Sequence, residues 1–476
     1  MNRTILAWLI IWFVLCSEPS DAATLAGALD GATMGWPWAI PFAALLLSIA
    51  IGPLLFPHLW HRHYGKVALG WSATALAALA ISYGIPTTIA AFVHAMLAEY
   101  LSFIVLLFAL YVVAGGILVT GNLRGTPPIN TALLAIGTLM ASLVGTTGAA
   151  MILIRPLLRA NEERPHRAHT VVFLIILVAN VGGALTPLGD PPLFVGFLHG
   201  VDFFWTAQHI WLQTTIVTIP ILLLFFAIDA GFCRKEMPPE THMPVGLRVR
   251  GKLNLVLIAL IVGAMLTSSI WKPGLSVTVY GTGLALENIA RNTALIVIAL
   301  ASLWLTPREH RASNGFTWEP IREVAKLFAG IFVTVIPVIA MLVAGHDGAF
   351  AWLLRAVTEP NGQPNEIAYF WLSGALSAFL DNAPTYLVFF ELAGGDAATL
   401  MGPLASTLAA ISMGAVYMGA LTYIGNAPNF MVYAIAQQRG IKMPGFFAYT
   451  FWAALILVPL FLLLTWLPIP PMIRSA

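Results

Sequence analysis

One short sequence pattern occurs twice in this chain. The first copy begins at Gly183 and the second at Gly419, 236 residues further on, and both read G-A-L-T-x-[LI]-G-[DN]-x-P-x-F. Glycine and proline at such close spacing interrupt a helix, because glycine is a poor helix former and proline removes a backbone donor. We therefore expect the two halves of the chain to fold alike around the same interruption.

The rest of the chain is strongly apolar. Hydrophobic residues make up 59% of it and charged residues 9%, with a mean hydropathy of +0.86. A bilayer core of roughly 30 Å is crossed by about 20 helical residues, and helices satisfy their own backbone groups in lipid. This composition predicts an all-α polytopic membrane protein with about ten transmembrane helices. The candidate spans are 38–57, 67–83, 101–120, 170–188, 210–232, 253–271, 292–306, 327–344, 404–423 and 446–467.

The first residues resemble a secretory signal peptide. Arg3 is followed by an apolar run over 5–15 and then by small residues ending near Ala22. We predict a signal peptide over 1–22, with a retained N-terminal anchor as the alternative. If the mature N-terminus lies outside, the predicted spans place most of the 23 basic residues on the cytoplasmic side. The predicted location is the bacterial inner (cell) membrane, multi-pass, with both termini outside.

Two apolar segments carry a polar tip and do not fit as ordinary spans. The segment 129–158 is interrupted at Gly145, and 368–392 is interrupted at Asp381. The apolar stretches that follow the two tips correspond to roughly 15 and 10 Å of helix, which is too short to cross a bilayer. We therefore predict two re-entrant hairpins whose tips lie at mid-membrane, covered by protein or by a cavity.

The hairpin tips share the spacing of the repeated pattern, because Asp381 also lies 236 residues after Gly145. The predicted topology inserts the two hairpins from opposite faces, which is typical of an inverted-topology repeat. The predicted organisation is scaffold helices at 38–100 and 253–306, repeat 1 at 101–233 with hairpin 129–158 and broken helix 170–200, and repeat 2 at 325–470 with hairpin 368–392 and broken helix 404–436.

Asp190 and Asp381 are the two acidic residues inside the repeated motifs. An ionisable residue at mid-membrane costs roughly 2.5–3.5 kcal/mol on insertion scales, so we treat both as functional. Desolvation disfavours a charged carboxylate, which can then hold either a proton or a small metal ion. Neighbouring hydroxyl and amide oxygens suit sodium, a hard cation. The predicted ion-binding set is Asp190, Asp381, Asn180, Thr146, Thr147, Thr186, Asn382, Thr385, Thr422, Asn426 and Asn429, with Gly145, Gly189 and Gly425 supplying backbone at the broken helices and Asp190 and Asp381 as sodium ligands.

Purely structural roles are the alternative for several of these residues. Asp381 is followed by Asn382 and Pro384, so it could simply cap the second arm of the hairpin. Threonine hydroxyls also bond to carbonyls of their own helix.

The two halves resemble the ion transporter superfamily, which contains citrate and dicarboxylate transporters, arsenite-pump membrane subunits and NhaD-type sodium/proton antiporters. The residues from Asn180 to Asp190 are similar to the N-x-G-G-A-x-[ST]-P-x-G-D stretch of the NhaD-type antiporters, and those from Asp381 to Pro384 to their D-N-x-P stretch. The chain is also similar to a branch labelled for citrate transport. The resemblance implies a homodimer with a scaffold and a mobile transport domain working by an elevator motion.

The first hairpin tip departs from both better-known branches. NhaD-type antiporters usually carry acidic residues there and the citrate and dicarboxylate transporters Ser-Asn-Thr, whereas this chain has Gly145-Thr146-Thr147. We predict a secondary active cation (sodium)/proton antiporter, because a tip carboxylate opposes a bound anion. Sodium- or proton-coupled citrate or carboxylate transport is the alternative, and arsenite efflux ranks third. No enzyme motif is found, no cofactor is expected beyond sodium and protons as transported or coupling ions, and the expected partners are membrane lipids, a second copy and a small cation or carboxylate, but no nucleic acid.

Overall fold

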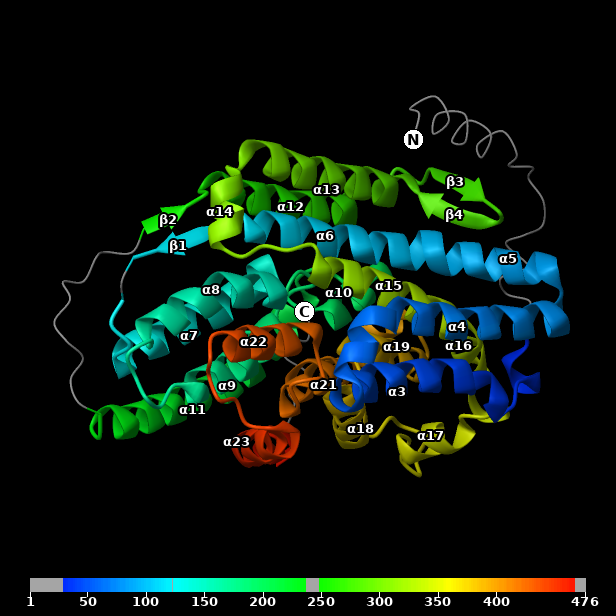
Figure 1. The fold of residues 1–476 in the computed structure, drawn as a ribbon. Coiled ribbons are helices and arrows are strands. Elements are labelled where there is room, and N and C mark those ends of the chain that lie inside the picture. The colour runs from blue at the N-terminus through cyan, green and yellow to red at the C-terminus, as the bar shows by residue number, and fades with distance from the viewer. Residues whose placement is uncertain (1–28, 122, 237–247, 467–476) are drawn as a thin grey trace, which may run out of the picture. The chain divides into compact units, whose positions relative to one another are not determined.

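The computed structural model describes residues 29–121, 123–236 and 248–466 of the 476-residue chain. The predicted signal peptide over 1–22 lies outside the described residues. The described chain is predominantly helical (Figure 1), and its strands form two small antiparallel sheets. One pairs β1 (Leu118–Thr120) with β2 (Arg248–Arg250), and the other pairs β3 (Ser276–Val279) with β4 (Thr282–Ala285).

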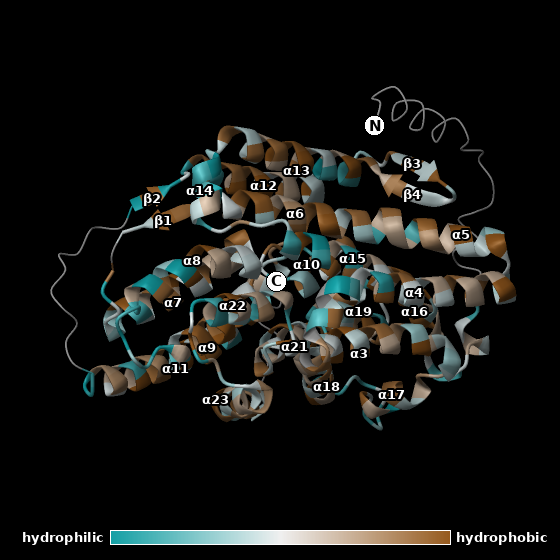
Figure 2. Ribbon diagram, in the orientation of Figure 1, coloured by the Kyte–Doolittle hydropathy of each residue, from teal (hydrophilic) through white to brown (hydrophobic). Residues whose placement is uncertain are grey.

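Hydrophobic residues run along most of the helices (Figure 2). In the described chain, eight helices are long and apolar enough to cross a membrane, or nine if the bent pair α15 (Glu319–Thr334) and α16 (Ile336–Val343) is one span. This confirms an all-α polytopic membrane protein, while the count of about ten stays a prediction. The candidate spans are Trp36–Pro53, Arg62–Tyr83, Ile85–Gly115, Pro127–Val144, Trp205–Cys233, Leu253–Ile270, Leu286–Leu305 and Phe446–Trp466.

Two expected spans are shorter than a bilayer in the structure. α9 (Ala168–Leu177) overlaps the predicted span 170–188, and α21 (Ala405–Tyr417) lies in the predicted span 404–423. Both helices end shortly before the repeated pattern. Each is followed by one short turn of 3-10 helix, η4 (Val181–Gly183) or η6 (Met418–Leu421). The repeated pattern therefore breaks a helix in each half.

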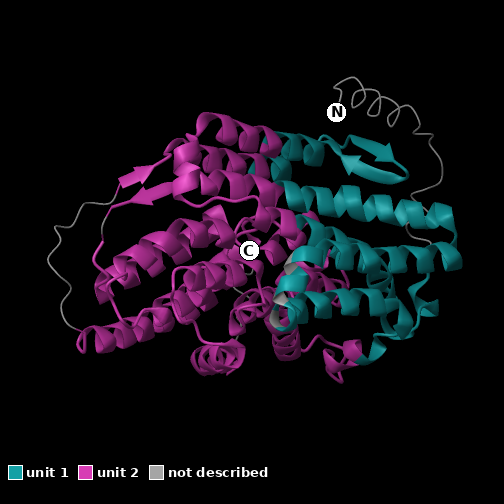
Figure 3. Cartoon of the chain, in the orientation of Figure 1, with its two compact units in different colours: residues 1–105, 266–294, 325–352 teal, residues 106–265, 295–324, 353–476 magenta. Residues whose placement is uncertain are grey.

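The chain divides into two compact units (Figure 3). Unit 1 comprises residues 1–105, 266–294 and 325–352, and unit 2 comprises 106–265, 295–324 and 353–476. Every residue predicted to bind ions belongs to unit 2. The boundaries of the predicted scaffold and repeats stay a prediction that these units do not test.

Unit 1 is built around α3 (Ile40–Leu55), α4 (Pro57–Tyr83) and α5 (Ile85–His94), which continues through the π-helical η3 (Ala95–Tyr100). Met34, Leu79 and Met341 form a buried cluster in it. α15 and α16 meet at a bend of 41°, where Pro337 occupies the first turn of α16. Apart from the two similar series of helices in unit 2, the remaining α-helices of the described residues are α6 (Leu101–Gly115), α12 (Leu253–Ile270), α13 (Leu286–Leu305), α14 (Arg308–Ser313), α17 (Ala351–Ala356) and α20 (Ala397–Met401).

Unit 2 contains the same series of helices twice. A helical hairpin comes first in each half, formed by α7 (Pro127–Val144) with α8 (Thr146–Ala160) and by α18 (Glu366–Phe379) with α19 (Asn382–Leu392). The interrupted helix follows, and its last part is α10 (Pro191–Leu198) or α22 (Ala427–Gln438). A long helix, α11 (Trp205–Cys233) or α23 (Phe446–Trp466), ends each series. At about 22 and 16 Å, α8 and α19 are shorter than a bilayer core.

Short helices of each series pack against short helices of the other series. α10 packs against α19 of the other series, and α22 packs against α8. All four helices begin beside a tip or a break, at residues 146, 191, 382 and 427. This exchange brings both tips and both breaks to one place.

Candidate functional site

The glycines of the repeated pattern allow the backbone to fold back on itself at each break. A Cβ atom on Gly189 would lie 2.1 Å from the carbonyl oxygen of Gly183, and one on Gly425 would lie 2.7 Å from that of Gly419. Both distances are too short for any side chain. The seventh position of the pattern is therefore glycine because its backbone is in contact with that of the first position.

The threonine of the pattern ties each break to the hairpin of its own half. The Thr186 hydroxyl donates to the Ser142 carbonyl, and the Thr422 hydroxyl donates to the Ala378 carbonyl at 2.5 Å. Both acceptors lie near the end of the first hairpin arm, in α7 and α18. Both threonines belong to the predicted ion-binding set, and in the structure their hydroxyls bond to backbone carbonyls of the first hairpin arm.

Asp190 is the centre of the site. Its side chain is buried, with 1% of the residue exposed. Oδ1 accepts hydrogen bonds from the Thr146 hydroxyl and the Asn426 amide, both at 3.1 Å, and Oδ2 accepts one from the Asn382 amide at 2.5 Å. Thr146 begins α8 and Asn382 begins α19, so one carboxylate joins both hairpin tips and both breaks.

A row of side-chain amides continues from Asp190. The Asn426 amide also donates to the Ala179 carbonyl at 3.2 Å, and Asn180 donates to the Asn429 Oδ1 atom at 2.7 Å. Asn429 in turn donates to the carbonyls of Gly419 and Thr422. The structure thus brings together five predicted residues around or next to Asp190: Thr146, Asn180, Asn382, Asn426 and Asn429.

Four further predicted residues lie at the tips or in the first turn after them and are not hydrogen-bonded to Asp190 in the described structure. The Asp381 carboxylate accepts from the Ala383 backbone N–H at 3.3 Å and caps α19, and the Thr385 hydroxyl donates to the Asp381 carbonyl. Thr147 is half-buried just after the tip. Gly145 has a φ of +82° as the residue before α8, a conformation that glycine adopts freely. The contacts of Asp381 are those of a helix cap, as the structural alternative predicted. Ion binding by Asp381 stays a prediction.

The negative charge of Asp190 has no cationic side chain beside it. Among the described residues, no Lys, Arg or His forms an ion pair with this carboxylate. The buried Asn382 Oδ1 atom also has no hydrogen-bond partner in the described chain. Helix N-termini at the site contribute about 0.3–1 kcal/mol each, whereas burying a charge costs several kcal/mol. A proton or a small cation is therefore needed to neutralise the site.

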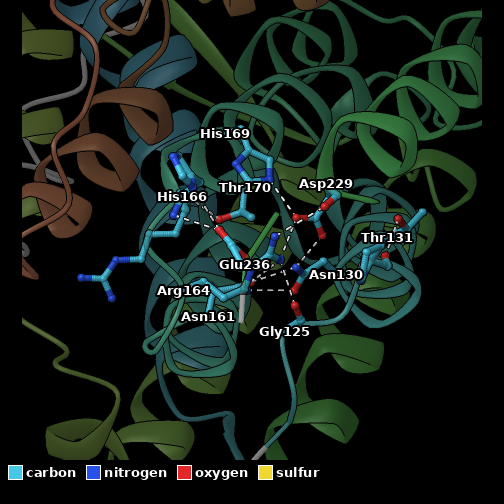
Figure 4. Close-up of polar contacts among 12 residues, drawn as sticks. Gly125, Asn130, Thr131, Asn161, Arg164, His166, His169, Thr170, Asp229 and Glu236 are labelled. Atoms are coloured by element: carbon cyan, nitrogen blue, oxygen red, sulfur yellow. Dashed lines mark hydrogen bonds and ion pairs between the residues drawn. The ribbon is translucent and has the colours of Figure 1, made fainter. Parts of the chain in front are cut away.

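A second polar cluster, not anticipated from the sequence, joins the outer ends of the first series (Figure 4). The buried Arg164 side chain lies 2.7 Å from both Asp229 Oδ1 and Glu236 Oε2. His169 Nε2 lies 2.9 Å from Asp229, whose other oxygen accepts from Asn130. The cluster links the start of α7, the loop after α8, the start of α9 and the end of α11. Its residues are spread over 130–236, so no local motif marks it.

The carboxyl of Glu236 makes this cluster sensitive to acid. Burial raises its pKa, but the hydrogen bonds from Arg164 and the His166 backbone and the charge of Arg164 outweigh burial and leave the pKa lowered. A lowered pKa in the folded state contributes stability above the unfolded-state value and loses it as pH falls through the folded-state value.

We therefore expect thermal stability in detergent to fall as pH drops below about 4.3, the ordinary glutamate value. The Glu236→Gln variant should show a flatter acid limb, and the exposed Glu359→Gln variant should follow the wild type. Melting temperatures between pH 7 and pH 3 check this. A Glu236→Gln curve parallel to wild type would contradict it.

Comparisons with known proteins place the chain among transporters. A family model described as "Putative citrate transport" matches residues 31–469. An uncharacterized transporter of Mycobacterium tuberculosis is 27% identical over 336 residues, which cover 67% of this chain and 71% of the relative. An uncharacterized transporter of Synechocystis is 24% identical over 404 residues, covering 79% of this chain and 82% of the relative.

Proposed function

The chain belongs to the family described as "Putative citrate transport", and from this premise we propose that it is a secondary active transporter that exchanges sodium or another small cation for protons at Asp190. Its relatives are bacterial transporters, so the proposed location is the inner membrane with both termini outside. The proposed assembly is a homodimer in which two inverted repeats form a moving transport domain.

The observation that carries the proposal is the burial of the Asp190 carboxyl group among neutral hydrogen-bond donors. A buried carboxylate bonded only to neutral donors is stable when it is protonated or when it binds a cation. A proton and a sodium ion cannot both bind the Asp190 carboxylate at the same time. This competition is what an exchanger requires. The unpartnered Asn382 Oδ1 atom offers a second oxygen ligand beside Asp190 Oδ2, and oxygen ligands suit a hard cation.

Coupled uptake of citrate or a related carboxylate is the second candidate. The family description favours it, and so do the four helix N-termini that begin at the tips and breaks, because such ends attract negative charge. In this case Asp190 would carry the coupling cation and the helix ends would face the anion. Arsenite efflux is a third candidate that rests on the superfamily resemblance alone.

Transport by the wild-type protein in everted membrane vesicles separates the first two candidates. We expect sodium chloride, but not choline chloride, to collapse a preset pH gradient that a fluorescent dye reports. Vesicles without the protein are the control. Uptake of radiolabelled citrate in the absence of any sodium-dependent proton movement would sink the exchange proposal and support the second candidate.

A further inference from the structure

The two exchanged helix pairs, α10 with α19 and α22 with α8, differ in the side chains that follow their first residues. Both pairs begin at the site, at Asp190 with Asn382 and at Asn426 with Thr146. Each residue of α19 corresponds to the residue 236 positions earlier in α8, and each residue of α10 to the residue 236 positions later in α22. Differences between the pairs are therefore differences in chemistry on the same backbone.

Polar groups capable of proton transfer continue along the α10–α19 pair. Tyr386 lies one helical turn, about 6 Å, beyond Asn382 on the same face of α19. A Cβ atom on Gly196 of α10 would lie 2.4 Å from the Tyr386 hydroxyl oxygen, so this hydroxyl fills the space that the glycine leaves. The buried Ser412 hydroxyl, which has no hydrogen-bond partner of normal geometry in the described chain, lies near that of Tyr386.

The outer end of this pair holds a histidine and a glutamate. His199 follows Gly196 by one turn, and its Nε2 atom lies 3.9 Å from Glu391 Oε1. His199 Nδ1 lies 2.9 Å from the Val195 carbonyl, which can only accept, so Nδ1 carries a hydrogen and donates it. In the neutral ring, Nε2 is then free to take up a proton on the side that faces Glu391.

At the corresponding positions the α8–α22 pair has none of these groups, and its tyrosine, Tyr433, donates to the Pro444 carbonyl at 3.1 Å. The counterpart of Tyr386 is Ala150 and that of Gly196 is Val432, so the large and small residues are exchanged between the two pairs. Glu391 corresponds to Arg155, and Ile435 stands where the first pair has His199. An arginine cannot give up its proton under ordinary conditions and repels other cations.

We propose that the α10–α19 pair is the proton route to Asp190, running through Tyr386 and the His199–Glu391 pair, and that the α8–α22 pair carries no protons. A tyrosine hydroxyl can donate and accept at the same time, so it can pass a proton on without a lasting charge. In the predicted topology the His199 end faces outside. This inference rests on the proposed function, in which Asp190 is protonated in each cycle.

The test compares tyrosine and glutamate variants in proteoliposomes. We expect Tyr386→Phe and Glu391→Gln each to slow proton movement driven by a sodium or citrate gradient by about tenfold or more. Stabilisation of the purified protein by the same ion should be unchanged, because Asp190 and Asn382 are intact. The double variant should be no slower than the slower single variant, since both residues serve one route. Gly196→Ala should slow proton movement as well, by displacing the Tyr386 hydroxyl.

Tyr417→Phe is the matched control. Tyr417 is equally buried, and its hydroxyl bonds at 2.8 Å to that of Thr214, which belongs to α11. If the wild type moves protons and Tyr386→Phe behaves like Tyr417→Phe, the route is wrong and the proposed function stands. If Tyr386→Phe loses ion-induced stabilisation together with proton movement, its role is structural and the route is again wrong. A wild type that moves no protons with either ion overturns the proposed function and the route together.

Discussion

Asp190→Asn is expected to abolish cation-driven proton movement while leaving the protein folded. Asparagine keeps the size of the side chain but can neither release a proton nor neutralise a cation. The charge that needs neutralising is also removed, so melting temperature without sodium should be equal to or higher than that of wild type. Sodium at a hundred times its dissociation constant stabilises a binding protein by about 2.7 kcal/mol, and this increment should vanish in the variant. Dye-reported proton movement and melting with and without sodium measure both effects.

Asp381→Asn is the informative comparison for this variant. Asparagine caps a helix as well as aspartate does, so the observed role of Asp381 at the start of α19 is preserved. We expect sodium-dependent stabilisation to remain in Asp381→Asn. If Asp381→Asn lost it and Asp190→Asn kept it, the coupling carboxylate would be the other one and the site would have been misassigned.

Arg164→Met is expected to give the largest loss of stability in the chain. Arg164 is the cation between Asp229 and Glu236, whose side chains are 0% and 7% exposed. Removing one partner of a buried ion pair costs about 3–5 kcal/mol, because the remaining charge stays buried and unpaired. The melting temperature in detergent and the yield of folded protein should both fall sharply.

Three further variants test the cause of that loss. Arg167→Ala removes a half-buried arginine whose side chain donates to the Glu162 carbonyl nearby, and it should change little. Adding Asp229→Asn and Glu236→Gln to Arg164→Met should recover part of the stability, since no unpaired charge is left. A triple variant as unstable as Arg164→Met would show that lost packing, rather than charge, explains the effect.

The sequence predicted much of this arrangement because its signals are local. The glycines and prolines of the repeated pattern predicted the breaks, and the polar tips at Gly145 and Asp381 predicted where α8 and α19 begin. The equal spacing of tips and breaks indicated that they belong to one site. The structure places helix boundaries at those positions and brings Asp190, Asn382 and Asn426 into contact.

Contacts between distant segments could not be predicted in the same way. In the sequence Asp190 and Asp381 are equal candidates, because only the packing of α10 against α19 shows which carboxylate accepts hydrogen bonds from both tips. The hydroxyls of Thr186 and Thr422 are predicted ion ligands, because the sequence does not show which backbone carbonyl a threonine hydroxyl will bond to. The Arg164 cluster draws on four separate elements, and in the second series Leu400 and Thr465 occupy the positions of Arg164 and Asp229. The repeat therefore does not predict the cluster around Arg164.

The exchange of short helices has a consequence for how the protein is made. When the ribosome has finished the first series, α10 and α8 exist but the helices they pack against, α19 and α22, are not yet synthesised. Asp190 then lacks the Asn382 and Asn426 amides that later surround it. The Asp190 site in the first half of the chain must therefore stay incomplete until nearly two hundred more residues, up to Asn426, have been synthesised. Neither half alone can form the present site. An ancestor with one half would have needed two separate chains to assemble such a site.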